Sequence, residues 1–210
     1  IPSNPKIANI NWSPNQKNIA FTNTSSDGVK LWVLNLESRS LVKLSDLKLN
    51  SNIRDVINWL NDSEILIKVI PENKKELIDQ SNIVPLGPTI SSNDGENAQN
   101  RTYQDLLKNK TDEFNFEQLV TSDLYKVDLN GRINKWLDSD MYTDITPSPD
   151  GEFVMVSNIK KPFSYIVTYG RFPKSTNIYD NEGMLVSNLV EVPLIEELPQ
   201  GFNAVWNGKR

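Results

Sequence analysis

The sequence contains neither cysteine nor histidine. Without cysteine the chain forms no disulfide, has no thiolate nucleophile and offers no sulfur ligand to a metal. Without histidine it cannot assemble a Ser-His-Asp or Cys-His catalytic arrangement from its own residues. The G-x-S-x-G, P-loop and G-x-G-x-x-G motifs are absent as well. We therefore identify no catalytic residue, no cofactor site and no metal site, and we expect the 210 residues to catalyse nothing by themselves.

Long hydrophobic runs and an excess of positive charge are also missing. No apolar run approaches the roughly 20 residues that span a bilayer, which predicts no membrane-spanning helix. The net charge of −5 argues against nucleic acid or an anionic membrane surface as the main partner. The chain begins with Ile1-Pro2-Ser3, without methionine or a signal-like segment, so we expect a processed or trimmed N-terminus.

What the sequence does contain is a repeated turn followed by a short apolar run. The first copy is Trp12–Phe21, and similar layouts recur at Trp59–Ile67 and Pro147–Met155. Proline sets φ at the first turn position, and Asn, Asp and Gly tolerate the tight positions that follow it. The apolar runs do not alternate with polar residues, which indicates strands buried on both faces. Each copy therefore predicts a β-hairpin.

A second hairpin pattern follows each copy of the first. It spans Leu31–Leu44, Leu124–Trp136 and Asn177–Val186, and a turn glycine is present in the second and third copies. Two hairpins in succession make a four-stranded antiparallel sheet. A four-stranded repeat of about 40–45 residues is typical of a β-propeller blade. The sequence therefore predicts an all-β fold, a partial β-propeller.

The repeats divide the chain into blades. We expect blades at residues 1–55, 56–145 and 146–192, and the start of a further blade at 193–210. The second blade carries a large, mainly non-β insertion at about 71–117, and the third carries a shorter one at about 161–172. Both lie between the second and third strands of a blade, so both should emerge on one face of the propeller. Long ordered loops often carry function, although the two insertions could instead merely pack against each other.

Several residues in and around the insertions call for interpretation. Thr102–Asp105 has the form of a capping box, which predicts a short helix from Tyr103, and 112–119 is a candidate for a second helix. Asn93, Asp94 and Glu96 do not have the spacing of a calcium loop, so we interpret them as a solvated turn.

Four tryptophans fall at blade positions. Trp12 and Trp59 occupy matching places in the repeat, while Trp32 and Trp136 lie in predicted strands. We expect all four to pack in the core or between blades rather than to form a ligand cage.

Four runs of residues resemble a known family. They are Val84–Thr89, Gln99–Leu107, Lys160–Tyr165 with Arg171–Pro173, and 190–201. Together they resemble the N-terminal β-propeller of the prolyl oligopeptidase family of serine peptidases, in the branch related to glutamyl endopeptidases. The resemblance implies a C-terminal α/β-hydrolase domain in the same polypeptide, absent here, which holds the catalytic triad. The propeller would then cap that domain and filter peptide substrates. A secreted or periplasmic location is suggested by the resemblance alone.

The resemblance to glutamyl endopeptidases implies a cationic partner for an acidic substrate side chain. Arg101 lies in the most family-like run, Tyr103 is close enough in sequence to add a hydroxyl donor, and Arg171 in the shorter insertion is the alternative cation. Arginine binds a carboxylate through two parallel hydrogen bonds. A second interpretation is that Arg101 pairs with a local acid such as Asp105 and holds the loop together.

A different class of function remains open from the sequence. The chain could be a stand-alone propeller that serves as a scaffold for protein–protein interaction. Further blades followed by G-x-S-x-G and a late histidine in the full-length gene would favour the peptidase. A stop codon directly after Arg210 would favour the scaffold.

Overall fold

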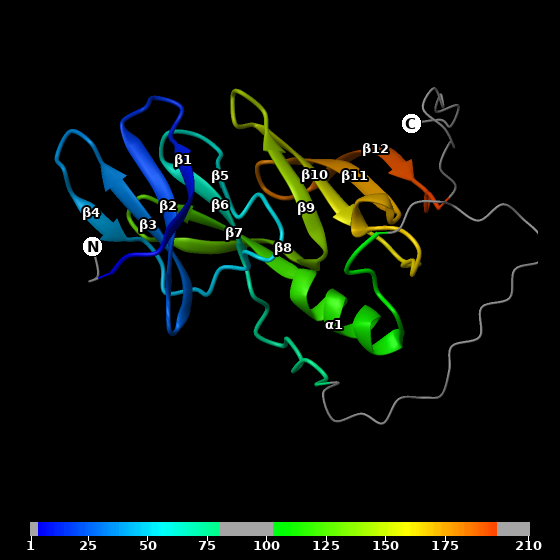
Figure 1. Cartoon of the computed structure of the whole chain (residues 1–210). Helices are drawn as coiled ribbons and strands as arrows, with labels where there is room; N and C mark the ends of the chain where they lie inside the picture. Colours follow the sequence, from blue (N-terminus) through cyan, green and yellow to red (C-terminus); the bar gives the residue numbers. More distant parts are fainter. Residues whose placement is uncertain (1–3, 80–102, 197–210) are drawn as a thin grey trace, which may run out of the picture.

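The computed structural model describes residues 4–79 and 103–196. These residues form three four-stranded antiparallel sheets (Figure 1). The first sheet contains β1 (Ile7–Trp12), β2 (Asn18–Ser25), β3 (Gly28–Asn35) and β4 (Leu41–Lys43). The second contains β5 (Ile57–Trp59), β6 (Glu64–Val69), β7 (Ser122–Asp128) and β8 (Ile133–Asp140). The third contains β9 (Tyr142–Pro147), β10 (Phe153–Ile159), β11 (Lys174–Asp180) and β12 (Leu185–Val192).

The strands of each sheet lie in chain order, so each sheet is a meander of hairpins. This is the arrangement expected of propeller blades, and the all-β prediction is confirmed. Helical structure among the described residues consists of α1 (Lys110–Val120), between β6 and β7, and the short 3₁₀ helix η1 (Tyr169–Arg171), between β10 and β11.

The repeated turn has the same hydrogen bonding in the first and third sheets. The hydroxyl of Ser13 donates to Asn15 Oδ1 over 2.8 Å and accepts from the backbone nitrogen of Asn18 over 3.0 Å. In the third sheet the hydroxyl of Ser148 donates to Asp150 Oδ1 over 2.5 Å and accepts from the nitrogen of Phe153 over 3.0 Å. The Ser-Pro-Asn/Asp sequence thus closes each hairpin with its own side chains.

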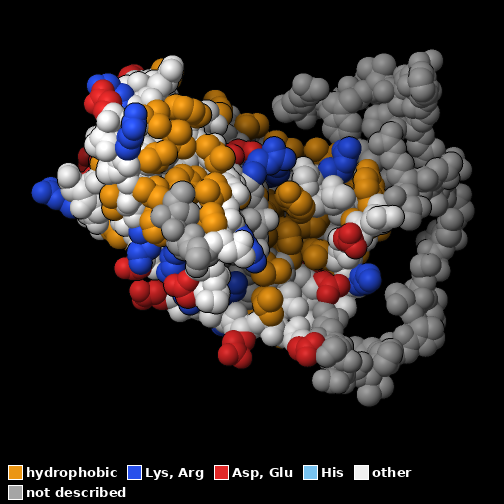
Figure 2. Space-filling model, turned by 60° about the vertical axis from the view of Figure 1, so that its left-hand side comes forward, with side chains coloured by type: hydrophobic (Ala, Val, Ile, Leu, Met, Phe, Trp, Pro, Cys, Tyr) orange, Lys and Arg blue, Asp and Glu red, His pale blue; other side chains and the backbone are white. Residues whose placement is uncertain are grey.

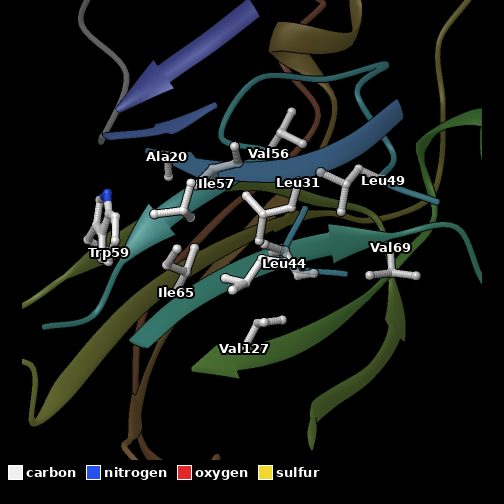
Figure 3. Packing of buried hydrophobic residues seen from close by; sticks show 12 residues of the cluster. Ala20, Leu31, Leu44, Leu49, Val56, Ile57, Trp59, Ile65, Val69 and Val127 are labelled. Atoms are coloured by element: carbon white, nitrogen blue, oxygen red, sulfur yellow. The ribbon is translucent and has the colours of Figure 1, made fainter. Parts of the chain in front are cut away.

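The sheets stack face to face, and two apolar clusters fill the spaces between them. Between the first and second sheets, residues such as Leu31 pack against Ile65 and Val127 (Figure 3). Between the second and third sheets, Leu66 and other residues of the second sheet pack against Val154 and Val156. The middle sheet is therefore buried on both faces, as its uninterrupted apolar run Ile65–Ile67 predicts.

Hydrogen bonds join the first and second sheets along their innermost strands. The indole Nε1 of Trp59 donates to the carbonyl oxygen of Asn11 over 3.1 Å. In return, the side-chain amide of Asn11 donates to the carbonyl oxygen of Ile57 over 3.1 Å. The Asp62 carboxylate accepts from the backbone nitrogen of Asn15 over 2.8 Å, which links the two hairpin turns. Trp59 thus joins the second sheet to the first.

The expectation for the four tryptophans is met in part. Trp59 and Trp136 are buried between sheets, and Trp32 is half-buried. The prediction is wrong for Trp12, whose side chain is 53% exposed although it occupies the same repeat position as Trp59. The physical reason is that no described sheet lies on that side of the first sheet.

The large insertion, between β6 and β7, contains one of the two expected helices. α1 (Lys110–Val120) covers the predicted segment 112–119, and the side chain of its N-cap Asn109 accepts from the backbone nitrogen of Asp112 over 2.9 Å. The helix predicted from Tyr103 is wrong, because residues 103–108 are not helical. Asp105 has φ of 57°, a left-handed conformation that interrupts a right-handed helix.

The two ends of the stack expose apolar side chains, which gives an expected result for the isolated chain. Ile10 and Trp12 are exposed at one end, and Phe153 and Met155, which alternate with the buried Val154 and Val156, are exposed at the other. Exposed apolar surface of this kind favours association. We expect the purified 210-residue chain to self-associate reversibly in sedimentation velocity at high concentration. A sharp monomer at all concentrations would contradict this.

Candidate functional site

The two insertions lie together at one edge of the stacked sheets. α1 follows the long segment that leaves β6, and the segment 160–173 leaves β10 (Figure 1). Both segments connect the second and third strands of their sheets, and such connections in successive antiparallel blades leave from the same edge. We call the surface that α1 and residues 160–173 form together the insertion face.

An aromatic cluster joins the two parts of the insertion face. Phe116 of α1 packs edge-on against Phe163 and Phe172, with ring centroids 5.2 Å and 5.7 Å away. Phe163 and Phe172 stack on each other at 5.3 Å, and Tyr169 lies 6.2 Å from Phe116. Aromatic pairs at these separations are stabilising beyond the area that they bury. The helix and the loop therefore form one packed unit.

Polar contacts surround the aromatic cluster. The hydroxyl of Tyr165 donates to Glu113 Oε1 over 2.6 Å, and Lys161 Nζ lies 2.9 Å from Glu117 Oε2. The hydrogen bond from Tyr165, with a further one from Lys110, holds the pKa of the Glu113 carboxyl below its ordinary value. Glu113 is therefore an anion at neutral pH, and it anchors the loop to α1.

A polar pocket of about 210 Å³ opens beside α1. Lys74 and Lys75 line one side, and Glu117, Gln118 and Thr121 of the helix region line the other. Gln118 Oε1 accepts from the backbone nitrogen of Lys75 over 2.9 Å. Glu117 thus faces both the pocket and Lys161, which places charges of both signs on the insertion face.

The three residues that the sequence singled out fall in different places. Arg101 lies outside the described residues. Tyr103 is half-buried and packs at the margin of the cluster that contains Phe163 and Phe172. Arg171 ends η1, is partly exposed, and accepts with its carbonyl oxygen from the nitrogen of Ile195 over 3.1 Å. Within residues 4–79 and 103–196 Arg171 takes part in no ion pair.

Sequence reasoning missed the aromatic cluster and a buried lysine. The signal for the cluster was a concentration of aromatic residues in both insertions, at Phe116, Phe163, Tyr169 and Phe172. Lys68 is only 1% exposed, and its signal was a single charge inside the apolar run Ile65–Ile70. Charged residues are rarely buried without partners, so a lysine in this run indicates that polar groups surround its ammonium group.

The described residues contain no group of three or more acidic, histidine or cysteine side chains placed to hold a metal ion. Asn93, Asp94 and Glu96, for which the sequence predicts a solvated turn, lie outside the described residues. In the same part of the chain, no helix is both long and apolar enough to cross a membrane.

The whole chain is similar to parts of longer known proteins. It is 35% identical to a protein named "Probable glutamyl endopeptidase, chloroplastic" from Oryza sativa subsp. japonica, over 100% of this chain and 23% of the relative. A protein with the same name from Arabidopsis thaliana is 33% identical over the same shares. No family model matches the chain. The resemblance to glutamyl endopeptidases is thus confirmed, and the chain spans about a quarter of the length of these relatives.

The fold has a counterpart among solved structures. A putative TolB from Agrobacterium tumefaciens superposes with a TM-score of 0.51 at 11% identity, over 90% of this chain and 50% of that one. At this level of identity the likeness concerns the fold alone. Fold and homology together make the chain a propeller segment homologous to part of the glutamyl endopeptidases.

Proposed function

We propose that this chain, homologous over its whole length to glutamyl endopeptidases, is the non-catalytic propeller portion of a serine peptidase of that type. In this role it caps an α/β-hydrolase domain of the same polypeptide and positions peptide substrates. The observation that carries the proposal is the homology of all 210 residues to proteins with that name. The lack of histidine fits it, because the general base must then lie elsewhere in the polypeptide.

The insertion face is the surface that we assign to substrate filtering. The aromatic cluster and the contacts of Glu113 and Glu117 hold α1 and residues 160–173 in one arrangement. A rigid, charged face of this kind can select among peptides, whereas loosely held loops would adapt to all of them. The first sheet has no such insertion: its second and third strands are joined by the short turn Ser25–Gly28.

We propose that Arg101 or Arg171 recognises an acidic substrate side chain, and of these two arginines the structure describes Arg171. Arg171 is partly exposed and belongs to the segment that carries Phe172. The burial of Phe172 fixes the backbone beside it. A planar guanidinium placed in this way binds a carboxylate with directional, charge-assisted hydrogen bonds. Tyr103 is proposed to support the site from the half-buried margin of the cluster.

The experiment compares two matched substrates with the full-length enzyme. We expect Arg171→Ala or Arg101→Ala to lower kcat/KM for a glutamyl peptide by about 1.5–3 kcal/mol, roughly 10- to 150-fold. The same peptide with glutamine in place of glutamate should change little, because it offers no charge to lose. Arg132→Ala is the control, since Arg132 lies in the turn between β7 and β8 and its side chain is 83% exposed.

Equal losses on the glutamyl and glutaminyl peptides, together with a lower Tm, would show that the arginine stabilises the fold rather than binds substrate. Loss with the glutamyl peptide in Arg132→Ala as well would show a general effect of charge. Either result removes the arginine from the proposed site.

A further inference from the structure

A pocket of about 370 Å³ opens between the first sheet and the turn that joins β7 to β8 in the second sheet. One half of its described lining is polar and the other half is aliphatic. The polar residues are Asn18, Asn35, Ser38 and Ser40, and the aliphatic residues are Val33, Val42, Leu44 and Leu129. We call this cavity the Asn18 pocket. Figure 2 turns the end of the molecule that carries the first sheet forward and shows hydrophobic side chains there, with charged ones mainly around their margin.

The corresponding space between the second and third sheets is filled by two large side chains. Strand register places Lys126 of the second sheet where the first has Val33, and Trp136 where it has Leu44. Lys126 Nζ donates to the carbonyl oxygen of Asn181, and the Trp136 indole donates to the same oxygen over 3.1 Å. Because valine and leucine are shorter, the first sheet leaves an open pocket at this position. Its volume lies within the range of about 300–1,000 Å³ for small-ligand sites.

A hydrogen-bond network along the polar half leaves one buried donor beside the pocket. Asn35 Oδ1 accepts from the backbone nitrogen of Ser38 over 2.9 Å, which fixes the orientation of the Asn35 amide. Asn35 Nδ2 therefore faces Asn18 and donates to Asn18 Oδ1 over 2.9 Å. This bond directs Asn18 Nδ2 away from Asn35, and within residues 4–79 and 103–196 no atom accepts from it. Because Asn18 is only 5% exposed and lines the pocket, the pocket is where this donor finds an acceptor.

The polar half also presents an acceptor, and the walls of the pocket are held in place. The Ser38 hydroxyl gives its proton to Asn35 Oδ1 over 2.8 Å, so the Ser40 hydroxyl donates to Ser38 Oγ over 2.8 Å. Ser40 Oγ is left with lone pairs for an incoming N–H group. On the aliphatic side, the Asp128 carboxylate accepts two backbone hydrogen bonds within its own turn and thereby fixes the turn that carries Leu129. A preformed pocket of this kind binds a ligand at a small entropic cost.

We propose that the Asn18 pocket binds a neutral peptide of another molecule and holds one of its aliphatic side chains against the aliphatic half of the lining. In this contact a peptide carbonyl accepts from Asn18 Nδ2, and a peptide N–H donates to Ser40 Oγ. Ser38, Ser40 and Val42 are exposed, so the pocket is reached from solvent. The site is separate from the insertion face, because the turns that border it leave from the opposite edge of the sheets. The proposal concerns binding and does not depend on the peptidase function.

The lining selects this class of ligand over others of similar size. No described lining residue is charged, so a carboxylate or an ammonium group would lose its hydration without compensation. A sugar carries several hydroxyl groups, and the aliphatic half offers them no partner. A peptide unit instead has one acceptor and one donor, which match Asn18 Nδ2 and Ser40 Oγ, and an aliphatic side chain matches the apolar half.

Saturation-transfer difference NMR with the full-length protein tests the proposal. The probe is N-acetyl-leucinamide, a capped neutral residue, and N-acetyl-leucine is its charged counterpart. We expect the neutral probe to bind with a Kd on the order of 1–10 mM, an ordinary value for so small a ligand. Its methyl groups should receive the strongest saturation because they contact the aliphatic half. N-acetyl-leucine should bind about tenfold more weakly, because its carboxylate finds no cation in the lining.

Variants of the lining locate the bound probe. Val42→Asp places a charge in the aliphatic half at a position that is 51% exposed, and we expect it to raise the Kd of the neutral probe about tenfold. Val186→Asp is the matched control, because Val186 is 53% exposed and also lies on the outer strand of its sheet, so this variant should bind as the native protein does. Asn18→Asp keeps an acceptor for Asn35 but removes the donor, which should raise the Kd about threefold to tenfold.

Unchanged binding in both Val42→Asp and Asn18→Asp would place the probe elsewhere on the protein and overturn the proposal. So would equal losses in Val42→Asp and Val186→Asp, which would show a general effect of charge. Absence of saturation transfer from the native full-length protein would overturn it as well, and would leave the pocket to a segment of the same polypeptide.

Discussion

Replacement of Gly151 by alanine is expected to lower the free energy of unfolding by about 2–5 kcal/mol. Gly151 has φ of 75° in the turn between β9 and β10, where an L side chain costs about 1–2 kcal/mol. A Cβ atom there would also stand 2.4 Å from the carbonyl oxygen of Leu60 in the second sheet. Relief of that overlap requires the two sheets to shift apart at this turn, which adds about 1–3 kcal/mol.

Two other glycines separate strain from overlap. Gly131 has φ of 82°, but its nearest atom is the oxygen of Leu44 at 3.6 Å, so Gly131→Ala should cost only the strain. Gly170 has no left-handed φ and its nearest atom is 3.9 Å away, so Gly170→Ala should be nearly neutral. Urea denaturation of the dilute chain gives all three values. Equal losses for Gly151→Ala and Gly131→Ala would mean that the second and third sheets do not meet at this turn.

The second large effect concerns the buried Lys68. Its Nζ donates to the carbonyl oxygens of Arg54, Tyr142 at 3.3 Å and Thr143 at 3.5 Å, and so joins the second sheet to the third. Burial lowers the pKa of Lys68 to about 8, while the carboxylates of Asp55 and Asp144 act in the opposite direction.

The sign of the pH dependence follows from this lowered pKa. In the unfolded chain lysine titrates near its ordinary pKa of about 10.4. Between about pH 8 and pH 10.4 the unfolded state therefore binds more protons than the folded state. Stability should rise with pH across this window, by on the order of 3 kcal/mol for a shift of this size.

Lys68→Met is the matched variant, because methionine retains most of the side-chain length and cannot titrate. Subtracting its free energy of unfolding from that of the native chain at each pH removes the contributions of the other groups, Asp55 and Asp144 among them. We expect the difference to increase from pH 7.5 to pH 10.5. A difference that stays flat or falls would show that Lys68 is not a buried ammonium between the sheets.

The fold class could be predicted from the sequence because its information is local. Turn chemistry at Ser13-Pro14-Asn15 and Ser148-Pro149-Asp150 closes each hairpin within a few residues, and apolar runs such as Ile65–Ile67 show burial on both faces. The segment 112–119 was likewise identified as helical, and the structure extends it to Lys110–Val120.

The errors arise where distant residues decide the outcome. The capping pattern at Thr102–Asp105 predicts a helix, yet Asp105 adopts a left-handed conformation, and Tyr103 packs against the aromatic cluster. Trp12 matches Trp59 in sequence, but Trp59 is buried against the first sheet, whereas no described sheet lies beside Trp12. Lys68 is stabilised by carbonyl groups of the third sheet, more than seventy positions away in the chain. No local pattern encodes these contacts.

The central claim is that these residues are the non-catalytic propeller portion of a serine peptidase. Labelling of the full-length protein with a fluorophosphonate, followed by identification of the modified serine, tests it most directly. We predict that the label attaches to one serine outside residues 1–210 and that the 210-residue chain alone is neither labelled nor able to cleave a glutamyl peptide. Labelling of a serine within residues 1–210, or of no serine in an active full-length protein, would contradict the claim.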